Sequence, residues 1–207
     1  MANNNCKYQQ KQACFTQQVI IRVLLALAFG LSSFPIGVLY AEDERPPPGF
    51  ENGQLRLQLF PWSTEQMAAF FEARGFPVLM IEKLSAYCFF TATIKNKRND
   101  VLQLDLADWR FVSQDGELQR IPRSQWPPLW KKMGIPLASQ STFRWMLLPE
   151  TLHFYPHEKE GGNVVLKKTT AAFSLRARFG LGENTDPVTA TVDNLQCADV
   201  TEAGKPL

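Results

Sequence analysis

The sequence predicts a mainly β protein, an antiparallel β-sandwich with short helical insertions. About eight short segments have the composition or the alternating pattern of β-strands, and turn signals separate them. The 12 glycines and 14 prolines suit a chain rich in turns. Aromatic residues make up 12% of the chain, enough to build a dense core between two sheets.

Residues 87–112, YCFFTATIKNKRNDVLQLDLADWRFV, form the centre of the predicted sandwich. Two strand-like runs flank the polar segment 96–100, so we expect them to pair as a hairpin. In the first run Cys88, Phe90 and Ile94 share one face. In the second run alternate leucines share a face, and Trp109 and Phe111 continue it.

The other strands are predicted from alternation and from turn residues at their ends. Residues 54–60 and 173–179 alternate most clearly, with leucines and phenylalanines on one face. Further strands are expected at 118–121, 163–166 and 188–192. Residues 141–148 are also expected to form a strand, with Phe143, Trp145 and Leu147 inward and Arg144 outward. Arg144 would then join Arg176 and Arg178 in a basic stripe able to accept an anionic partner, or serving solubility alone.

Three short helices are expected between these strands. Ser63 and Gln66 have the spacing of a capping box, and Met67, Phe70 and Phe71 follow at helical spacing, so a helix is predicted over 64–74. Pro77 suits the first turn of a second helix over 77–86. A third is expected within 123–135.

The N-terminal residues 1–41 have the arrangement of a signal peptide. Lys7, Lys11 and Arg22 precede 23–41, which are uncharged, and an acidic run follows Ala41. The alternative is an uncleaved anchor in the inner membrane formed by 23–41. We expect residues 42–52 to form a proline-rich linker, 53–200 the β-sandwich domain and 201–207 a flexible tail.

The charge and the cysteine content of the chain indicate its class of partner and its cellular compartment. The leader carries three of the 22 basic residues and none of the 20 acids, which leaves 19 basic against 20 acidic groups. This balance argues against nucleic acid as a partner. Cys88 and Cys197 are the two cysteines outside the leader, and in an exported protein we expect them to form a disulfide. A periplasmic or secreted location follows, with membrane contact only if the leader is retained.

Residues 93–118, TIKNKRNDVLQLDLADWRFVSQDGEL, resemble the early strands of telokin-like, immunoglobulin-fold domains found in uncharacterised bacterial exported proteins. The segments GGNVVL and FSLRARF, residues 161–166 and 173–179, resemble the later strands of such domains. The resemblance implies an immunoglobulin-like sandwich outside the cytoplasm. It carries no catalytic residues.

Two groups of residues are candidate sites. Trp126, Trp130 and Met133 recur at helical spacing beside basic residues, which is typical either of a helix packed on a sheet or of a partner surface. His153 and His157 are the only histidines, and a His-x₃-His pair is a candidate zinc or copper ligand set, although Pro156 interrupts a regular helix there. The alternative is a pair of solvated loop residues.

No sequence motif of an enzyme or a cofactor site is present. A Gly-x-Ser-x-Gly elbow, a phosphate-binding loop and a His-Glu-x-x-His helix are all missing from the sequence. We therefore expect an exported, non-catalytic module that acts through contacts with a protein partner in the cell envelope. The alternative is a ligand- or metal-handling periplasmic domain that uses the loop from His153 to Glu160.

Overall fold

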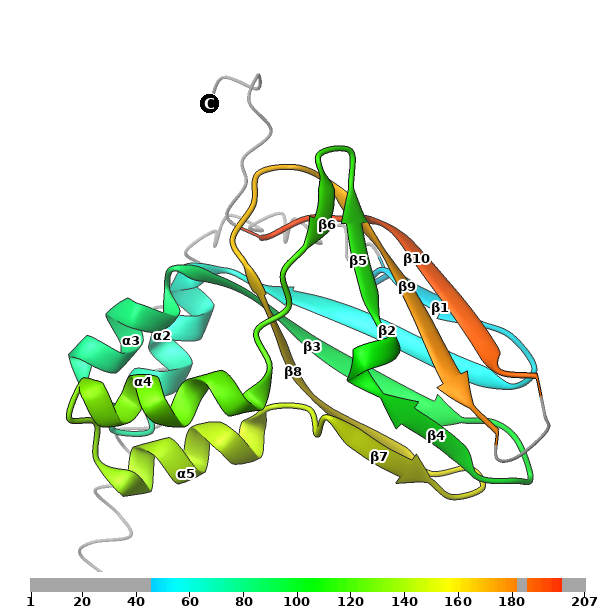
Figure 1. The fold of residues 1–207 in the computed structure, drawn as a ribbon, viewed down its shortest axis with the longest axis horizontal. Helices are drawn as coiled ribbons and strands as arrows, with labels where there is room; N and C mark the ends of the chain where they lie inside the picture. Colours follow the sequence, from blue (N-terminus) through cyan, green and yellow to red (C-terminus); the bar gives the residue numbers. More distant parts are fainter. Residues whose placement is uncertain (1–45, 182–185, 199–207) are drawn as a thin grey trace, which may run out of the picture. The chain divides into compact units, whose positions relative to one another are not determined.

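A computed structural model describes residues 46–181 and 186–198. They form two antiparallel sheets packed with four short helices (Figure 1). The elements, in chain order, are β1 (Gly49–Glu51), β2 (Leu55–Trp62), α2 (Thr64–Glu72), α3 (Val78–Leu84), β3 (Tyr87–Asn96), β4 (Leu102–Asp105), the 3-10 helix η1 (Leu106–Asp108), β5 (Arg110–Ser113), β6 (Gly116–Leu118), the 3-10 helix η2 (Arg123–Gln125), α4 (Trp126–Lys132), α5 (Leu137–Met146), β7 (Thr151–Phe154), β8 (Lys159–Lys167), β9 (Phe173–Gly180) and β10 (Val188–Leu195).

One sheet has four strands in the order β1-β2-β3-β8, and the other has six strands arranged around β9. On one side β9 pairs with β10, and on the other side it pairs with both β4 and β5, which occupy successive parts of its length. The 3-10 helix η1 separates β4 from β5, so the two behave as one interrupted strand. The prediction of a mainly β fold with helical insertions is confirmed. The immunoglobulin-like strand order stays a prediction.

The predicted hairpin at 87–112 is wrong, because its two halves belong to different sheets. β3 pairs with β2 and β8, whereas β4 pairs with β7 and β9. The crossover begins at Asn96, which is fully buried. The nitrogen of its side-chain amide donates to the backbone carbonyl oxygens of Asp100, Phe154 and Tyr155, at 2.7, 3.1 and 3.1 Å. These bonds hold the turn against β7, and the chain enters the second sheet there.

Strand β3 is buried on both faces at its start, which explains its central position. Cys88, Phe90 and Ile94 face the core between the two sheets. Phe89 points the other way, into a second core where the helices cover the four-stranded sheet. Figure 1 shows the four helices gathered at one end of β3 and β8. The residues of this second core are Met67, Phe71, Phe76, Met80, Leu84, Phe89, Ile121, Trp126, Trp130, Ile135, Phe143, Leu147 and Val165.

The three predicted helices are present. Ser63 caps α2, since its hydroxyl accepts from the Gln66 backbone nitrogen and the Gln66 side chain accepts from the Ser63 nitrogen, both at 3.0 Å. Gly75, where we expected the helix to end, has a φ of 70°. α3 follows Pro77, and α4 carries two prolines in its first turn.

Residues 141–146 belong to helix α5 rather than to the predicted strand 141–148, and Leu147 and Leu148 follow the helix. The alternation there covers only three apolar residues, Phe143, Trp145 and Leu147. Phe143 and Leu147 are also four residues apart, a spacing that places them on one face of a helix. Phe143 is buried while Trp145 is 81% exposed, so the two do not share a face. Arg144 therefore does not join Arg176 and Arg178, which lie on β9.

The predicted linker 42–52 supplies a strand, because β1 pairs with β2 from Gly49 onward. The Asn52 side chain accepts from the backbone nitrogens of Gln54 and Leu55, at 2.8 and 2.9 Å, and so reverses the chain. Glu51 then bonds Arg56 on β2 at 2.6 Å and Lys97, just beyond β3, at 2.9 Å. The prolines predicted an extended linker here. The turn at Asn52 and the two ion pairs of Glu51 instead hold the end of this segment against β2.

Glu51 gives a pH-dependent prediction. Hydrogen bonds from Arg56 and Lys97 lower the pKa of its carboxyl to about 2. A carboxyl with a depressed native pKa stabilises the fold above its unfolded pKa, and this contribution is lost as the pH falls through the native pKa. We expect wild-type protein to be more stable than Glu51→Gln near neutral pH, and the difference to shrink between about pH 4.5 and 2. A carboxyl NMR titration with a midpoint near 4.5, or a difference independent of pH, contradicts this expectation.

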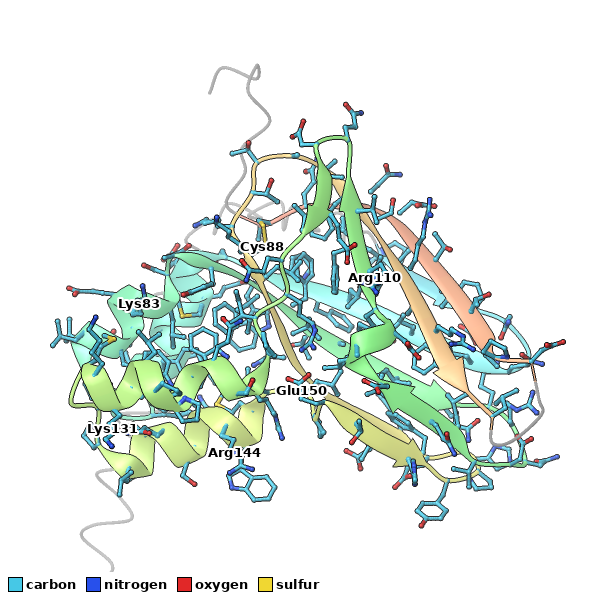
Figure 2. All side chains as sticks on the ribbon, viewed as in Figure 1. Lys83, Cys88, Arg110, Lys131, Arg144 and Glu150 are labelled. Atoms are coloured by element: carbon cyan, nitrogen blue, oxygen red, sulfur yellow. A yellow bond between two sulfur atoms is a disulfide. The ribbon has the colours of Figure 1, made fainter. Side chains whose placement is uncertain are left out.

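The predicted disulfide is present between Cys88 and Cys197, whose Cα atoms lie 5.6 Å apart (Figure 2). It joins β3 of the four-stranded sheet to the chain just beyond β10 of the other sheet. Because disulfides form and persist in oxidising compartments, the bond indicates an extracytoplasmic protein. The expected signal peptide or anchor at 1–41 and the expected tail at 201–207 lie outside the described residues. In the described ranges, no helix is long and apolar enough to cross a membrane.

Candidate functional site

Helix α4 carries the three residues expected to form either a packed helix or a partner surface. Trp126 and Trp130 are 2% and 1% exposed, and Met133 at the helix end is half-buried. The two indole rings stack with their centroids 5.2 Å apart, and both meet the Phe143 ring edge-on, at 5.0 and 5.6 Å. The two tryptophans are therefore not available at the surface, and a protein partner that binds α4 and α5 must contact their exposed side chains instead.

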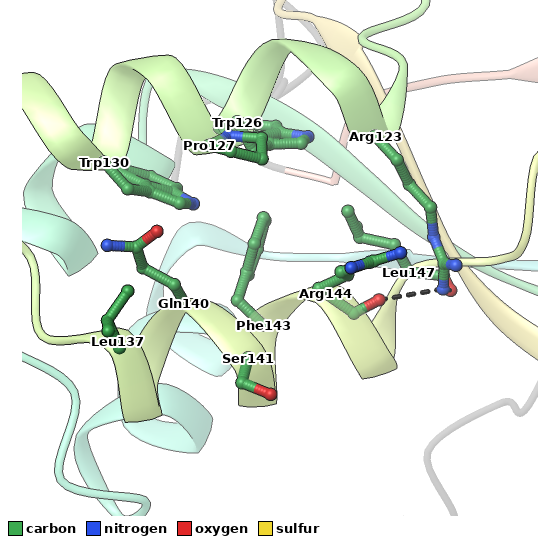
Figure 3. A pocket seen from close by; sticks show the side chains of 10 residues that line it. All are labelled: Arg123, Trp126, Pro127, Trp130, Leu137, Gln140, Ser141, Phe143, Arg144 and Leu147. Carbon is green, nitrogen blue, oxygen red and sulfur yellow. Dashed lines mark hydrogen bonds between the residues drawn. The ribbon is translucent and has the colours of Figure 1, made fainter.

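A pocket of about 340 Å³ lies between α4 and α5 (Figure 3). Its walls are mainly apolar, and two polar side chains and two arginines also reach it or its rim. The lining residues are Arg123, Trp126, Pro127, Trp130, Leu137, Gln140, Ser141, Phe143, Arg144 and Leu147. Figure 3 shows Leu137 and Gln140 at one end and the two arginines at the other. The pocket is therefore apolar along its length and cationic at one end.

Arg123 is fixed in place by bonds to both its backbone and its side chain. Its backbone nitrogen donates to Glu150 at 2.6 Å, and its guanidinium donates to the carbonyl oxygens of Arg144, at 2.8 Å, and Leu147. It thus caps the last carbonyls of α5, a favourable place for a cation. Burial, followed by the nearby charge of Arg144, lowers the pKa of Arg123.

The positive charge at this end is only partly balanced. Glu150, the acid that favours the charged form of Arg123, is also bound by Arg120 at 2.7 Å. The Arg144 side chain, by contrast, forms no hydrogen bond or ion pair within the residues that the structure describes. Two guanidinium groups therefore lie at one end of the pocket, and the nearby carboxylate of Glu150 is already engaged by Arg120.

Three buried donors of the pocket residues lack a hydrogen-bond acceptor. They are the indole nitrogens of Trp126 and Trp130 and Nε of Arg123. Only one other buried side-chain nitrogen or oxygen in the described ranges is in this state, Trp109 Nε1. Trp62 provides a contrast, because its indole donates to the Thr91 hydroxyl at 2.8 Å. An unpaired buried donor costs about 1–3 kcal/mol, and three of these four donors belong to residues of one pocket.

Two large apolar side chains of α5 are open to solvent next to this pocket. Trp145 and Leu137 are each 81% exposed, and Leu137 forms part of the pocket rim. Tryptophan is the residue type most enriched among interface anchors. Sequence reasoning missed Trp145, because alternation placed it inward on a strand.

A charge pattern in the sequence could have located this surface. Residues 118–149 contain no acid, but they contain Arg120, Arg123, Lys131, Lys132 and Arg144. Arg120 is neutralised by Glu150, whereas Lys131 and Lys132 are exposed on α4. Figure 2 shows Lys131 on α4 and Arg144 on α5. The total charge of the chain is close to neutral, so it does not reveal the excess of cations in residues 118–149.

The two histidines lie apart from this surface. His153 is exposed on β7, and His157 lies in the following turn with a φ of 62° and its Nε2 3.2 Å from the Asn99 side-chain oxygen. Across residues 46–181 and 186–198, no group of three or more His, Cys, Asp or Glu side chains is placed to hold a metal ion. The structure therefore gives the histidine pair no further ligand.

A second, smaller hollow of about 130 Å³ lies on the four-stranded sheet. It is lined by Arg56, Gln58, Thr93, Lys95 and Lys159. Arg56 is already engaged by Glu51, and the lining has no large apolar side chain. The α4–α5 pocket is the stronger candidate site.

No family model and no curated protein matches the chain. Two solved structures from Bacillus subtilis show distant structural similarity. YcdA, a candidate lipoprotein, is 12% identical over 72% of this chain and 39% of its own, with a TM-score of 0.39. YjhA is 7% identical over 72% of this chain and 96% of its own, with a TM-score of 0.42. The chain thus matches well under half of YcdA, and these likenesses assign it no function.

Proposed function

We propose that this protein is an exported, non-catalytic β-sandwich module of immunoglobulin-like type that binds a protein partner in the cell envelope. Its setting is periplasmic or secreted, which the disulfide and the leader both support. The partner docks on the α4–α5 face, defined by Lys131, Lys132, Leu137, Arg144 and Trp145.

The observation that carries this proposal is the exposure of Trp145. An indole that is 81% exposed leaves a large apolar surface in water, and burying it against a partner is favourable. Leu137, equally exposed on the same helix, extends the apolar surface. Removal of a central tryptophan from an interface typically costs 2 kcal/mol or more of binding free energy, roughly 30-fold in affinity.

The charge of this face specifies the partner. Lys131 and Lys132 are exposed on α4 and Arg144 is exposed on α5, and their segment, 118–149, contains no acid. Such a face attracts a polypeptide segment that carries aspartate or glutamate beside an apolar side chain. Rim charges act mainly on the rate of association, so binding should weaken as salt increases.

Site-specific photo-cross-linking in the cells that produce the protein tests this proposal. We expect p-benzoylphenylalanine at position 145 to form an adduct with an acidic segment of an envelope protein. The same group at position 155, where Tyr155 is 64% exposed but lies beyond β7, serves as the control and should form none. The double variant Lys131→Glu/Lys132→Glu should reduce the adduct at 145 several-fold.

Equal adducts at positions 145 and 155 would contradict a specific face. So would the absence of any adduct at 145, since an aromatic anchor lies within reach of its partner. An adduct at 145 to a segment without acidic residues, or one insensitive to the lysine substitutions, would overturn the proposed chemistry of the partner.

A further inference from the structure

The α4–α5 pocket has features of a small-molecule site that the exposed Trp145 does not explain, because Trp145 does not line it. Its volume of about 340 Å³ lies at the lower end of the range for ligand sites, roughly 300–1,000 Å³. The stacked indoles of Trp126 and Trp130 form one wall, and Phe143 and Leu147 come from the opposite helix. An apolar body of one or two rings, or a medium acyl chain, suits these walls.

The two guanidinium groups of the pocket, of Arg123 and Arg144, lie at one end, and Gln140 lies at the other. Figure 3 shows the nitrogen edges of both indoles turned toward the end that holds Arg123 and Arg144. Both tryptophans are at least 98% buried, and their nitrogens lack acceptors. The Nε of Arg123 is likewise buried and unpaired. Guanidinium and indole groups are donors only, so the arginine end of the pocket favours a ligand that carries an acceptor.

Electrostatics select a negatively charged acceptor. Arg144 has no partner in the described ranges, and Arg123 is so close to it that their repulsion contributes to the lowered pKa of Arg123. An anion placed between the two guanidinium groups relieves this repulsion and gains charge-assisted hydrogen bonds, which are about twice as strong as neutral ones. Arginine forks match carboxylate oxygens in geometry.

We propose that this pocket binds a small organic carboxylate, with its aromatic or acyl body between α4 and α5 and its carboxylate at Arg144 and Arg123. The site shares Leu137 and Arg144 with the docking face but does not include Trp145, and it stands whether or not a protein partner docks there. Arg144 is the specificity-determining residue, because its guanidinium is the uncommitted cation of the pocket.

Calorimetric titration with matched probes tests this inference on the exported protein with its disulfide intact. The probes are 3-phenylpropionate, octanoate, the neutral amide 3-phenylpropionamide and inorganic phosphate. We expect at least one of the two carboxylates to bind, 3-phenylpropionamide to bind at least about 10-fold more weakly than 3-phenylpropionate, and phosphate not to bind. The relative affinities of 3-phenylpropionate and octanoate then decide between an aromatic and an acyl body.

Three variants locate the site. Arg144→Gln should weaken carboxylate binding by about 10-fold. Arg176→Gln, on β9, and Trp145→Ala should leave it unchanged. Arg123 is unsuitable for substitution because its guanidinium caps the end of α5. A loss with Trp145→Ala but not with Arg144→Gln would overturn the inference and leave the docking proposal intact.

Indole N–H resonances supply a second readout that does not depend on affinity. Bound carboxylate should shift the resonance of Trp126 or Trp130, because both rings line the pocket and the ligand lies against them. The Trp62 resonance should not move, since that indole already bonds Thr91, and neither should that of Trp145. Absence of binding by both carboxylates, or equal binding of the amide and the acid, contradicts the inference.

Discussion

The Phe143→Ala variant is expected to lose about 3–5 kcal/mol of unfolding free energy, the cost of removing a large aromatic ring from a core. Phe143 is 1% exposed and its ring contacts those of Phe71, Trp126 and Trp130. It thus joins α5 to both α2 and α4. Urea denaturation of the exported protein, followed by far-UV circular dichroism, measures the loss.

Trp145→Ala is the matched control, because it removes a larger ring two residues away on the same helix. At 81% exposure its loss should change stability by no more than about 0.5 kcal/mol. A strand at 141–148 would place both rings on one face and make the two losses similar. Equal destabilisation by the two variants would therefore contradict the helix and the pocket that it forms.

The Cys88→Ser/Cys197→Ser variant is expected to lose roughly 4–5 kcal/mol, since the bond closes a loop with a sequence separation of 109 residues. Both cysteines are buried, and the bond joins the two sheets across the core. The loss comes mainly from the unfolded chain, which gains conformational freedom without the link. Urea denaturation of oxidised wild-type protein and of the variant gives the difference.

A reducing agent provides the control for this measurement. It should destabilise wild-type protein by a similar amount and leave the serine variant unchanged. Two freely alkylated thiols in the unreduced exported protein would refute the disulfide. A loss below about 1 kcal/mol would show that the link does not constrain the unfolded chain as the loop model requires.

Local signals in the sequence predicted the elements whose pattern lasts for several residues. β9 alternates over its whole length and β2 alternates from Leu55 to Phe60, so period-two burial was visible. The capping box at Ser63 marked the start of α2, because side-chain capping is a contact within four residues. The disulfide was predicted from the expected oxidising compartment and from the presence of two cysteines outside the leader, and this prediction needed no structural geometry.

The errors arose where distant contacts decide the outcome. The polar segment after β3 looks like a hairpin turn, but buried Asn96 bonds carbonyls of β7 and of the following turn and directs the chain into the other sheet. At 141–148, three alternating residues suggested a strand, whereas packing of Phe143 on the two tryptophans favours a helix. Neither contact is visible in the local pattern.

The candidate site was predictable only in part. The tryptophans of α4 were identified as a group, but their burial and the pocket beside them depend on α5, which was expected to be a strand. The absence of acids between 118 and 149 was available in the sequence. The unpaired donors and the two neighbouring arginines exist only once α4 and α5 lie side by side.

Hydroxyl-radical footprinting of Trp145, in the producing cells and in purified protein, measures whether a partner covers this side chain. In purified protein both Trp145 and Tyr155 are exposed, so both should oxidise rapidly. We expect Trp145 to be protected in cells and Tyr155 to oxidise at the same rate in both settings. Equal oxidation of Trp145 in cells and in purified protein would contradict a partner on the α4–α5 face.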